Sequence, residues 1–204
     1  LLLSMLLFTV MGIMTSAAMS APYMEGEVVG WTQLGPNNYA GRASAALFDK
    51  NKDGVVYVGT VGGLYVSVNY GKNWREIPLG DAVYNVTAIT QSDNGRLYVA
   101  TGDGTYRTYR GEMSQSRSNQ VSSQVGGGVF MQTEGMDAAW DASLSDAEKY
   151  ARIVDNFKFE AMTNTVPDSK YDYEGDFAYI NTILYANNTL YVGTVNRGLK
   201  RTSD

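Results

Sequence analysis

The sequence contains no cysteine and no histidine among its 204 residues. The absence of cysteine excludes disulfides and thiolate metal sites. The absence of histidine excludes a Ser-His-Asp triad, histidine metal ligands and a histidine general base. Chemistry in this chain must therefore use Asp, Glu, Tyr, Lys, Arg, Ser or Thr, and we expect no cofactor.

Proline is scarce, with 4 residues, whereas the chain holds 22 Gly and 15 Tyr. This composition suits many short strands joined by tight turns. The hydrophobic content of 44% is enough for a folded core. The formal net charge is −5, and nucleic-acid binding requires a basic face. We therefore expect no nucleic-acid partner.

The N-terminus has the pattern of a secretory signal peptide. An apolar run is followed by small residues, so we predict a signal peptide at 1–20, cleaved after Ala18 or Ser20, and a linker at 21–30. The apolar run is shorter than the roughly 20 residues that span a bilayer. We expect no stable membrane span after cleavage, and a secreted, periplasmic or cell-surface location. The chain begins with Leu1 and lacks a basic first part, which indicates a fragment.

Internal repeats indicate the fold. The string "GVVYVGTVGGLYVS" is echoed by "GRLYVATGDGTYRT" and by "NTLYVGTVNRGLKRTSD", and an apolar run precedes each copy. Tyr57 and Tyr98 occupy the same place in two copies and lie 41 residues apart. Short strands repeated at this period are typical of β-propeller blades. The dipeptides Asp53-Gly54 and Asn94-Gly95 predict two-residue hairpin turns with positive φ at both positions.

The segment after the first repeat, "SVNYGKNW", contains Ser67, Asn69, Gly71 and Trp74. It resembles the Asp-box (BNR) repeat of sialidases, xyloglucanases and sortilin-like receptors, here of a secreted bacterial type, with Asn69 in place of the usual Asp. The resemblance implies a hairpin between the third and fourth strands of a blade. Asn69 would cap backbone N–H groups of the turn, and Trp74 would fill the space between blades. In the last copy, Thr202 and Asp204 align with Ser67 and Asn69, so the sequence stops inside a box.

We therefore predict an all-β fold, comprising the first two to three four-stranded blades of an incomplete propeller, with one short inserted helix. The blades are expected at about 31–80, at 81–141 with an insertion at 102–128, and at 178–204, truncated, with a further insertion at 141–177. Within 141–177, Ser145-x-x-Glu148 matches a capping box. An apolar stripe at helical spacing follows, made of Ala147, Tyr150, Ala151 and Val154.

Candidate ligand-binding residues lie in the two insertions, because long loops on a rigid scaffold often carry function. Aromatic and guanidinium groups can bind sugars by stacking and forked hydrogen bonds. The candidates are Arg107, Tyr109, Arg110, Tyr171 and Tyr173.

Two acidic segments are weak metal candidates. Asp172, Glu174 and Asp176 alternate in "YDYEGD" and could gather around Ca²⁺, although a solvated acidic loop is the simpler interpretation. Residues 49–54 match the first half of a calcium loop, but Thr60 stands where that loop needs Glu, and a hairpin turn explains the segment. We therefore assign no metal site.

The resembling xyloglucanases carry an Asp before the Gly-Gly that follows the second strand of the first blade, where this sequence has Val61. Asp103 stands in the corresponding turn of the second unit and is therefore the candidate carboxylate. Glycoside hydrolysis needs two carboxylates flanking a cleft, and no partner for Asp103 is evident. Arg42 is interpreted as a structural residue. The leading hypothesis is a non-catalytic propeller that binds glycans or proteins. The alternatives are a xyloglucanase-like or sialidase-like hydrolase with catalytic residues partly outside this sequence, and a structural array without a ligand.

Overall fold

The computed structural model describes residues 30, 32–36, 41–82, 84–104, 124–136, 140–195 and 197–203. Contacts divide the chain into two compact units, Leu1–Gln33 and Leu34–Asp204. Every strand and helix below belongs to the second unit, and the predicted signal peptide lies outside the described residues. In the described part of the chain, no helix combines the length and apolarity that a bilayer crossing requires.

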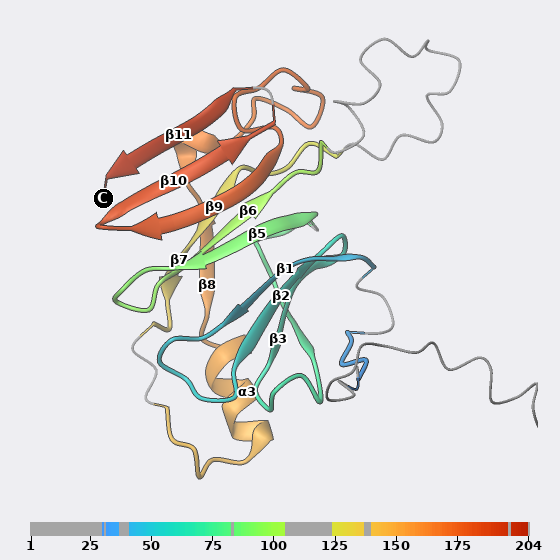
Figure 1. The fold of residues 1–204 in the computed structure, drawn as a ribbon, viewed down its shortest axis with the longest axis vertical. Helices are drawn as coiled ribbons and strands as arrows, with labels where there is room; N and C mark the ends of the chain where they lie inside the picture. The colour runs from blue at the N-terminus through green and yellow to red at the C-terminus, as the bar shows by residue number, and fades with distance from the viewer. Residues whose placement is uncertain are drawn as a thin grey trace, which may run out of the picture. The chain divides into compact units, whose positions relative to one another are not determined.

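The described residues of the second unit form mostly β-structure, with three antiparallel sheets and one α-helix (Figure 1). Consecutive strands pair in each sheet, which gives the orders β1-β2-β3-β4, β5-β6-β7-β8 and β11-β10-β9. The bounds are β1 (Ala43–Phe48), β2 (Val56–Thr60), β3 (Gly63–Ser67), β4 (Arg75–Ile77), β5 (Val86–Gln91), β6 (Leu97–Thr101), β7 (Val129–Glu134), α3 (Asp146–Val154), β8 (Lys158–Ala161), a 3-10 turn η2 (Thr163–Thr165), β9 (Ile180–Ala186), β10 (Thr189–Thr194) and β11 (Gly198–Ser203).

The three predicted repeats form the same local structure. A threonine ends the second strand of each sheet, and its hydroxyl donates to the carbonyl of the glycine that begins or precedes the third strand. The pairs are Thr60 to Gly63 (3.1 Å), Thr101 to Gly128 (2.7 Å) and Thr194 to Gly198 (3.1 Å). Each sheet also has a register irregularity where its first strand meets the end of its second strand. The sequence repeat is therefore a repeat of strand register and turn chemistry.

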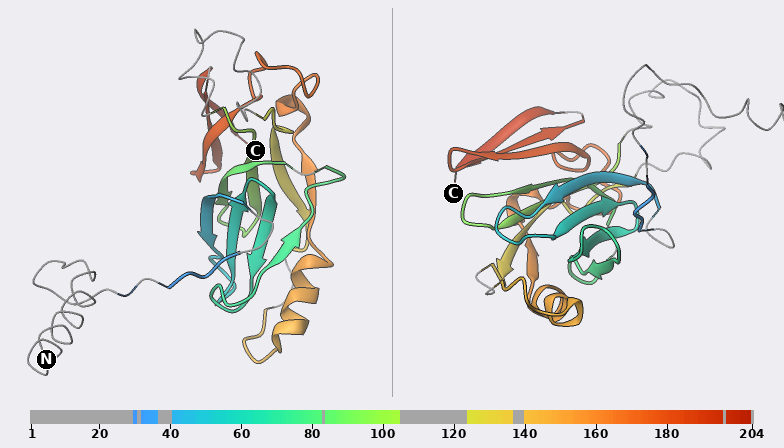
Figure 2. Two further views of the ribbon diagram at one scale, coloured as in Figure 1. Left: turned by 90° about the vertical axis from the view of Figure 1, so that its right-hand side faces the viewer. Right: turned by 60° about the horizontal axis from the view of Figure 1, so that its bottom comes forward.

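Apolar side chains fill the spaces between successive sheets. Tyr57 is fully buried between the first and second sheets and stacks on Phe157, with ring centroids 6.5 Å apart. Tyr98, at the equivalent place, is fully buried between the second and third sheets and stacks on Tyr185 at 5.8 Å. The first strands of the sheets also contact one another, β1 with β5 and β5 with β9, and the sheets stay next to each other in both views of Figure 2.

The first predicted hairpin turn is longer than expected. Strand β1 ends at Phe48 and β2 begins at Val56, and only Gly54 of the predicted dipeptide has positive φ (77°). The reason is Asp49, whose carboxylate accepts hydrogen bonds from the backbone of residues 51 and 52 and from the Tyr57 hydroxyl. These bonds order a wider loop.

The second predicted hairpin is also a wider loop, because Gly95 (φ 89°) alone of its dipeptide has positive φ. Ser92 organises this loop, since its hydroxyl accepts from the Arg96 N–H at 3.0 Å. The two-residue turn with positive φ at both positions occurs instead at Asn187 and Asn188 (51° and 53°), between β9 and β10. Asparagine tolerates that conformation better than most residues.

Residues 141–177, predicted as an insertion, contain part of the second sheet. Strand β8 lies within this segment and pairs with β7, which completes four strands. The preceding segment forms α3, as predicted, with both hydrogen bonds of the capping box at Ser145 and Glu148. The buried face of α3 is made by Tyr150 and Ile153. The alanines of the predicted stripe are exposed, because the helix presents a different face to the first sheet.

The Asp-box segment forms the expected capped turn. The Ser67 hydroxyl accepts from the Gly71 N–H at 2.8 Å, the Asn69 side-chain oxygen accepts from the Asn73 N–H at 3.0 Å, and Gly71 has a φ of 87°. The prediction for Trp74 was wrong: it is half-buried, and its indole N–H donates to the Leu34 carbonyl at 2.8 Å. Trp74 therefore covers this turn rather than the space between two sheets.

The third copy of the repeat keeps the same register. Thr202 pairs with Leu190 as Ser67 pairs with Val56, four residues before the threonine that ends the second strand. Asp204 lies outside the described residues.

Candidate functional site

Backbone hydrogen bonds of the segment that carries Asp103 link the second sheet to the third. The Gly102 N–H donates to the Asn85 carbonyl at 3.0 Å, and the Gly102 carbonyl accepts from the Ile180 N–H at 3.1 Å. Asp103 exchanges two backbone hydrogen bonds with Gln124, at 3.0 and 3.1 Å. The predicted insertion therefore leaves and rejoins the second sheet through a short paired stem.

Close backbone packing fixes this stem. Gly102 has a φ of 95°, and a Cβ at this position would lie 2.2 Å from the Ala178 carbonyl oxygen. The Gly126 N–H donates to that same oxygen at 3.0 Å. Glycine is required at residue 102 both for its conformation and for the space that it leaves.

The Asp103 side chain forms an ion pair with Arg42, which immediately precedes strand β1. The Asp103 side chain is 6% exposed and that of Arg42 is 50% exposed. The pair therefore joins a buried carboxylate of the second sheet to a half-solvated guanidinium at the start of the first sheet. This contact supports the structural interpretation of Arg42, and it compensates the charge of Asp103.

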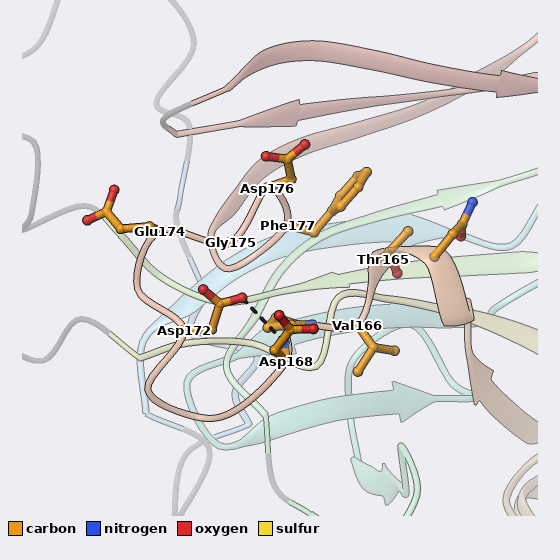
Figure 3. Close-up of a pocket in the computed structure, with 10 residues that line it drawn as sticks. Thr165, Val166, Asp168, Asp172, Glu174, Gly175, Asp176 and Phe177 are labelled. Carbon is orange, nitrogen blue, oxygen red and sulfur yellow. Dashed lines mark hydrogen bonds between the residues drawn. The ribbon is translucent and has the colours of Figure 1, made fainter.

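A cavity of about 350 Å³ is lined by residues of η2 and of the chain between η2 and β9 (Figure 3). Its wall is mostly polar, with acidic side chains at several points. Ten residues line it: Asn164, Thr165, Val166, Pro167, Asp168, Asp172, Glu174, Gly175, Asp176 and Phe177. The last of these directly precedes Ala178, which is bonded to the Asp103 stem.

The acidic residues of the cavity wall point in different directions (Figure 3). The Asp172 carboxylate accepts from the Asp168 N–H at 3.3 Å, and Glu174 points away from both Asp172 and Asp176. Asp176 forms ion pairs with Lys200 at 2.6 Å and Arg197 at 3.3 Å. The Lys200 hydrogen bond, with the charges of both cations, lowers the pKa of Asp176.

In the described part of the chain, no three acidic side chains are grouped in a way that could hold a metal ion. The weak metal candidates Asp172, Glu174 and Asp176 are therefore interpreted as part of a polar cavity wall. The sequence did not predict that Arg197 and Lys200, in the β10–β11 hairpin, pair with Asp176. They lie more than twenty residues from it, and no motif links the two segments.

The predicted ligand-binding tyrosines of this loop are exposed. Tyr171 is 64% exposed and Tyr173 is 44% exposed, and their ring centroids lie 6.5 Å apart at an interplanar angle of 56°. The Lys170 ammonium lies 5.0 Å from the centre of the Tyr171 ring. These tyrosines alternate along the chain with the cavity residues Asp172 and Glu174. The other predicted binding residues, Arg107, Tyr109 and Arg110, lie outside the described residues.

No protein-family model matches the chain, and no curated protein matches it. Among solved structures, the chain is similar to an ancestral GH74 enzyme, with a TM-score of 0.44, 16% identity, and coverage of 82% of this chain and 19% of that one. It is also similar to the computationally designed Ika4 protein, with a TM-score of 0.32, 16% identity, and coverage of 88% and 99%. The chain therefore spans about a fifth of the length of the ancestral enzyme.

Proposed function

We propose that the chain is part of a secreted or cell-surface β-propeller repeat protein and that its main role is to bind a ligand without catalysis. Three features support the propeller. The sheets repeat one register, each packs on the next through equivalent residues, and their first strands lie beside one another. Stacked antiparallel sheets with adjoining first strands are the arrangement of propeller blades. The secretory pattern of residues 1–20 supports the location.

The observation that carries the binding role is the exposed pair Tyr171 and Tyr173 beside the cavity. Two large aromatic side chains that are exposed on one loop offer stacking surface to a ligand. The neighbouring carboxylates and backbone groups offer hydrogen-bond acceptors. An aromatic surface beside polar acceptors suits the apolar faces and hydroxyl groups of a sugar ring.

The charge of the loop narrows the ligand class. Four carboxylates line the cavity, and one of them, Asp176, forms ion pairs with Lys200 and Arg197. An anionic glycan would meet repulsion there. We infer that a neutral polysaccharide is the ligand, in preference to a sialoside. A basic protein segment is the competing ligand class, and the experiment below distinguishes the two.

Isothermal titration with neutral oligosaccharides, with sialosides and with a basic peptide tests this proposal. We expect binding of the neutral glycan alone, and a roughly tenfold weaker Kd in Tyr171→Ala and in Tyr173→Ala, which corresponds to about 1.4 kcal/mol each. Tyr70→Ala is the matched control, because Tyr70 is 56% exposed on a different turn. Glycan binding that both loop variants retain in full, or binding of the basic peptide alone, would refute the glycan assignment.

Asp103 favours a second candidate, a glycoside hydrolase whose other carboxylate is supplied elsewhere. It is a buried carboxylate at the end of a strand, next to a long loop and beside the segment that lines the cavity. If this candidate is correct, the protein hydrolyses the bound glycan and Asp103→Asn abolishes turnover while binding persists. If the wild type does not hydrolyse the glycan, this second candidate is refuted and the binding role stands.

A further inference from the structure

Arg96 places its guanidinium against the sulfur atoms of two methionines. Its Nε donates to the Sδ of Met136 at 3.3 Å, and its Nη1 donates to the Sδ of Met131 at 3.5 Å. A thioether sulfur is a weak acceptor, whereas guanidinium is a strong donor that suits carboxylate and phosphate oxygens. In the described part of the chain, both side-chain hydrogen bonds of Arg96 end on sulfur. Its donors therefore meet acceptors much weaker than those they could bind.

The loop between β5 and β6 fixes the backbone of Arg96. The Arg96 N–H donates to the Ser92 hydroxyl at 3.0 Å, and the Arg96 carbonyl accepts from the Ser92 N–H at 2.9 Å. Strand β6 begins at the next residue, Leu97. The guanidinium is therefore presented from a backbone that is already ordered, and less conformational entropy is lost when it binds an acceptor.

The two methionines belong to β7 and to the chain that follows it. Met131 lies in β7 opposite Tyr98 of β6, and it packs against the core between the second and third sheets. Met136 comes two residues after β7 ends at Glu134. Both methionines are partly exposed, which gives a small solute access to this end of the second sheet.

Methionine supplies all the sulfur in this sequence, which has 9 Met and no Cys. Hydrogen peroxide converts a thioether into a sulfoxide. The sulfur lone pair forms a bond to one peroxide oxygen, the O–O bond breaks, and the other oxygen leaves as water with the proton of the first. The sulfur is oxidised by two electrons and the peroxide is reduced. The new oxygen carries partial negative charge, so it is a stronger hydrogen-bond acceptor than the sulfur was.

We propose that Met131 and Met136 form a methionine-oxidation site, in which the Arg96 guanidinium binds the sulfoxide oxygens that peroxide adds. Oxidation usually disrupts a core, because it places a polar oxygen among apolar groups without a partner. Here the donor already contacts both sulfurs, and each contact becomes a charge-assisted hydrogen bond. The oxidised site therefore ties the start of β6 to β7 and to the chain after it. It shares no residue with the Tyr171 loop, so either proposal can fail without the other.

Met162 provides a contrast within the same chain. Like Met131, it is partly exposed and packs against the core between the second and third sheets. Among the described residues, however, no arginine side chain donates to its sulfur. Oxidation of Met162 should therefore reduce stability whether or not Arg96 is present.

Treatment of the full chain with hydrogen peroxide, followed by mass mapping of each methionine and thermal unfolding, tests the proposal. The treatment should lower the Tm of the wild type no more than that of Met131→Leu/Met136→Leu, which lacks the site but keeps every other methionine. Arg96→Ala should lose about 5 °C more than the wild type, because its sulfoxide oxygens then lack a donor. Each protein is compared with its own untreated form, so the direct effect of the substitution cancels.

The NMR signal of the Arg96 Nε–H gives a second readout, which a purely structural role of the arginine would leave unchanged. Peroxide should shift this signal in the wild type and not in Met131→Leu/Met136→Leu. Equal losses of Tm in the wild type and Arg96→Ala overturn the inference, as does an Arg96 signal that does not respond to oxidation. Met131 and Met136 that stay unmodified while the other methionines are oxidised also overturn it, because peroxide then does not reach the site.

Discussion

The side-chain amide of Asn69 donates a hydrogen bond to the Asp146 carboxylate, with 2.6 Å between the two atoms. Asn69 belongs to the turn after β3 of the first sheet. Asp146 is the first residue of α3, which lies between strands β7 and β8 of the second sheet, so the bond joins the two sheets. The Tyr150 hydroxyl, one turn further along α3, donates to the Asn73 carbonyl of the same turn at 2.6 Å. The helix therefore covers the Asp-box turn. An aspartate at residue 69 could cap the turn, but it would place two carboxylates together.

Replacing Asn69 by Asp should destabilise the protein by about 1 kcal/mol, because a charge-assisted hydrogen bond becomes a contact between like charges in a partly solvated place. Urea denaturation measures the change. The double variant Asn69→Asp/Asp146→Asn restores a donor and an acceptor and should recover most of the loss. An equal loss in the single and double variants would show that Asp146 is not the cause.

The capping box of α3 gives a pH-dependent prediction. Hydrogen bonds from the Ser145 hydroxyl and backbone N–H lower the pKa of Glu148. Because the folded pKa lies below the unfolded one, this stabilisation is complete above the unfolded pKa and is lost as the pH falls through the folded pKa.

Ser145→Ala should therefore raise the pKa of Glu148 toward its ordinary value and reduce stability near neutral pH by about 1 kcal/mol. The difference in unfolding free energy between the wild type and Ser145→Ala should become smaller at acidic pH. Carbon-detected NMR titration of Glu148 measures the pKa, and Ser143→Ala, in the loop before the helix, is the comparison variant. A Glu148 pKa that does not respond to Ser145→Ala would contradict the cap.

Substitutions of Gly102 and Gly80 distinguish the energetic cost of backbone conformation from the cost of tight packing. Both have positive φ, 95° and 79°, but a Cβ meets the Ala178 carbonyl only at Gly102, and nothing lies within 4 Å of a Cβ at Gly80. Gly80→Ala should cost about 1 kcal/mol from conformation alone. Gly102→Ala adds overpacking and should cost about 2–4 kcal/mol. Equal losses of thermal stability in the two variants would show that the stem is not tightly packed.

The ion pair of Arg42 and Asp103 should respond asymmetrically to substitution. Arg42→Gln leaves a buried carboxylate without its cation and should cost about 2 kcal/mol, reduced from the usual cost of a buried pair because Arg42 is half-solvated. Asp103→Asn leaves a guanidinium that water can reach and should cost about 1 kcal/mol. Chemical denaturation measures the loss of stability in both variants. A larger loss in Asp103→Asn than in Arg42→Gln would contradict our interpretation that the carboxylate is the buried member of the pair.

The repeat in the sequence predicts the β-rich organisation, because Tyr57, Tyr98 and their neighbours follow one pattern that fixes strand, register and turn together. The capped turn at Ser67 and Asn69 and the helix at Ser145 could also be predicted, since both depend on hydrogen bonds within a few residues. The position of β8 could not be predicted. Its short strand has no repeat signal, and long-range pairing with β7 determines it.

The candidate site was predictable in its parts but not in its arrangement. The acidic residues at 168–176 and the tyrosines between them can be recognised in the sequence. The pairing of Asp103 with Arg42 joins the second sheet to the first, and the pairing of Asp176 with Lys200 joins the loop before β9 to β11. Neither follows from sequence spacing, because each partner lies more than twenty residues away.

The central claim is that the loop carrying Tyr171 and Tyr173 binds a neutral glycan. Its most direct test is an NMR titration of the labelled protein with a neutral oligosaccharide such as a xyloglucan fragment. We expect saturable shifts of the amide signals at 164–177 and of the two tyrosine rings, with the signals of Tyr70 unchanged. An unchanged spectrum at saturating glycan, or shifts confined to residues distant from this loop, would contradict the account.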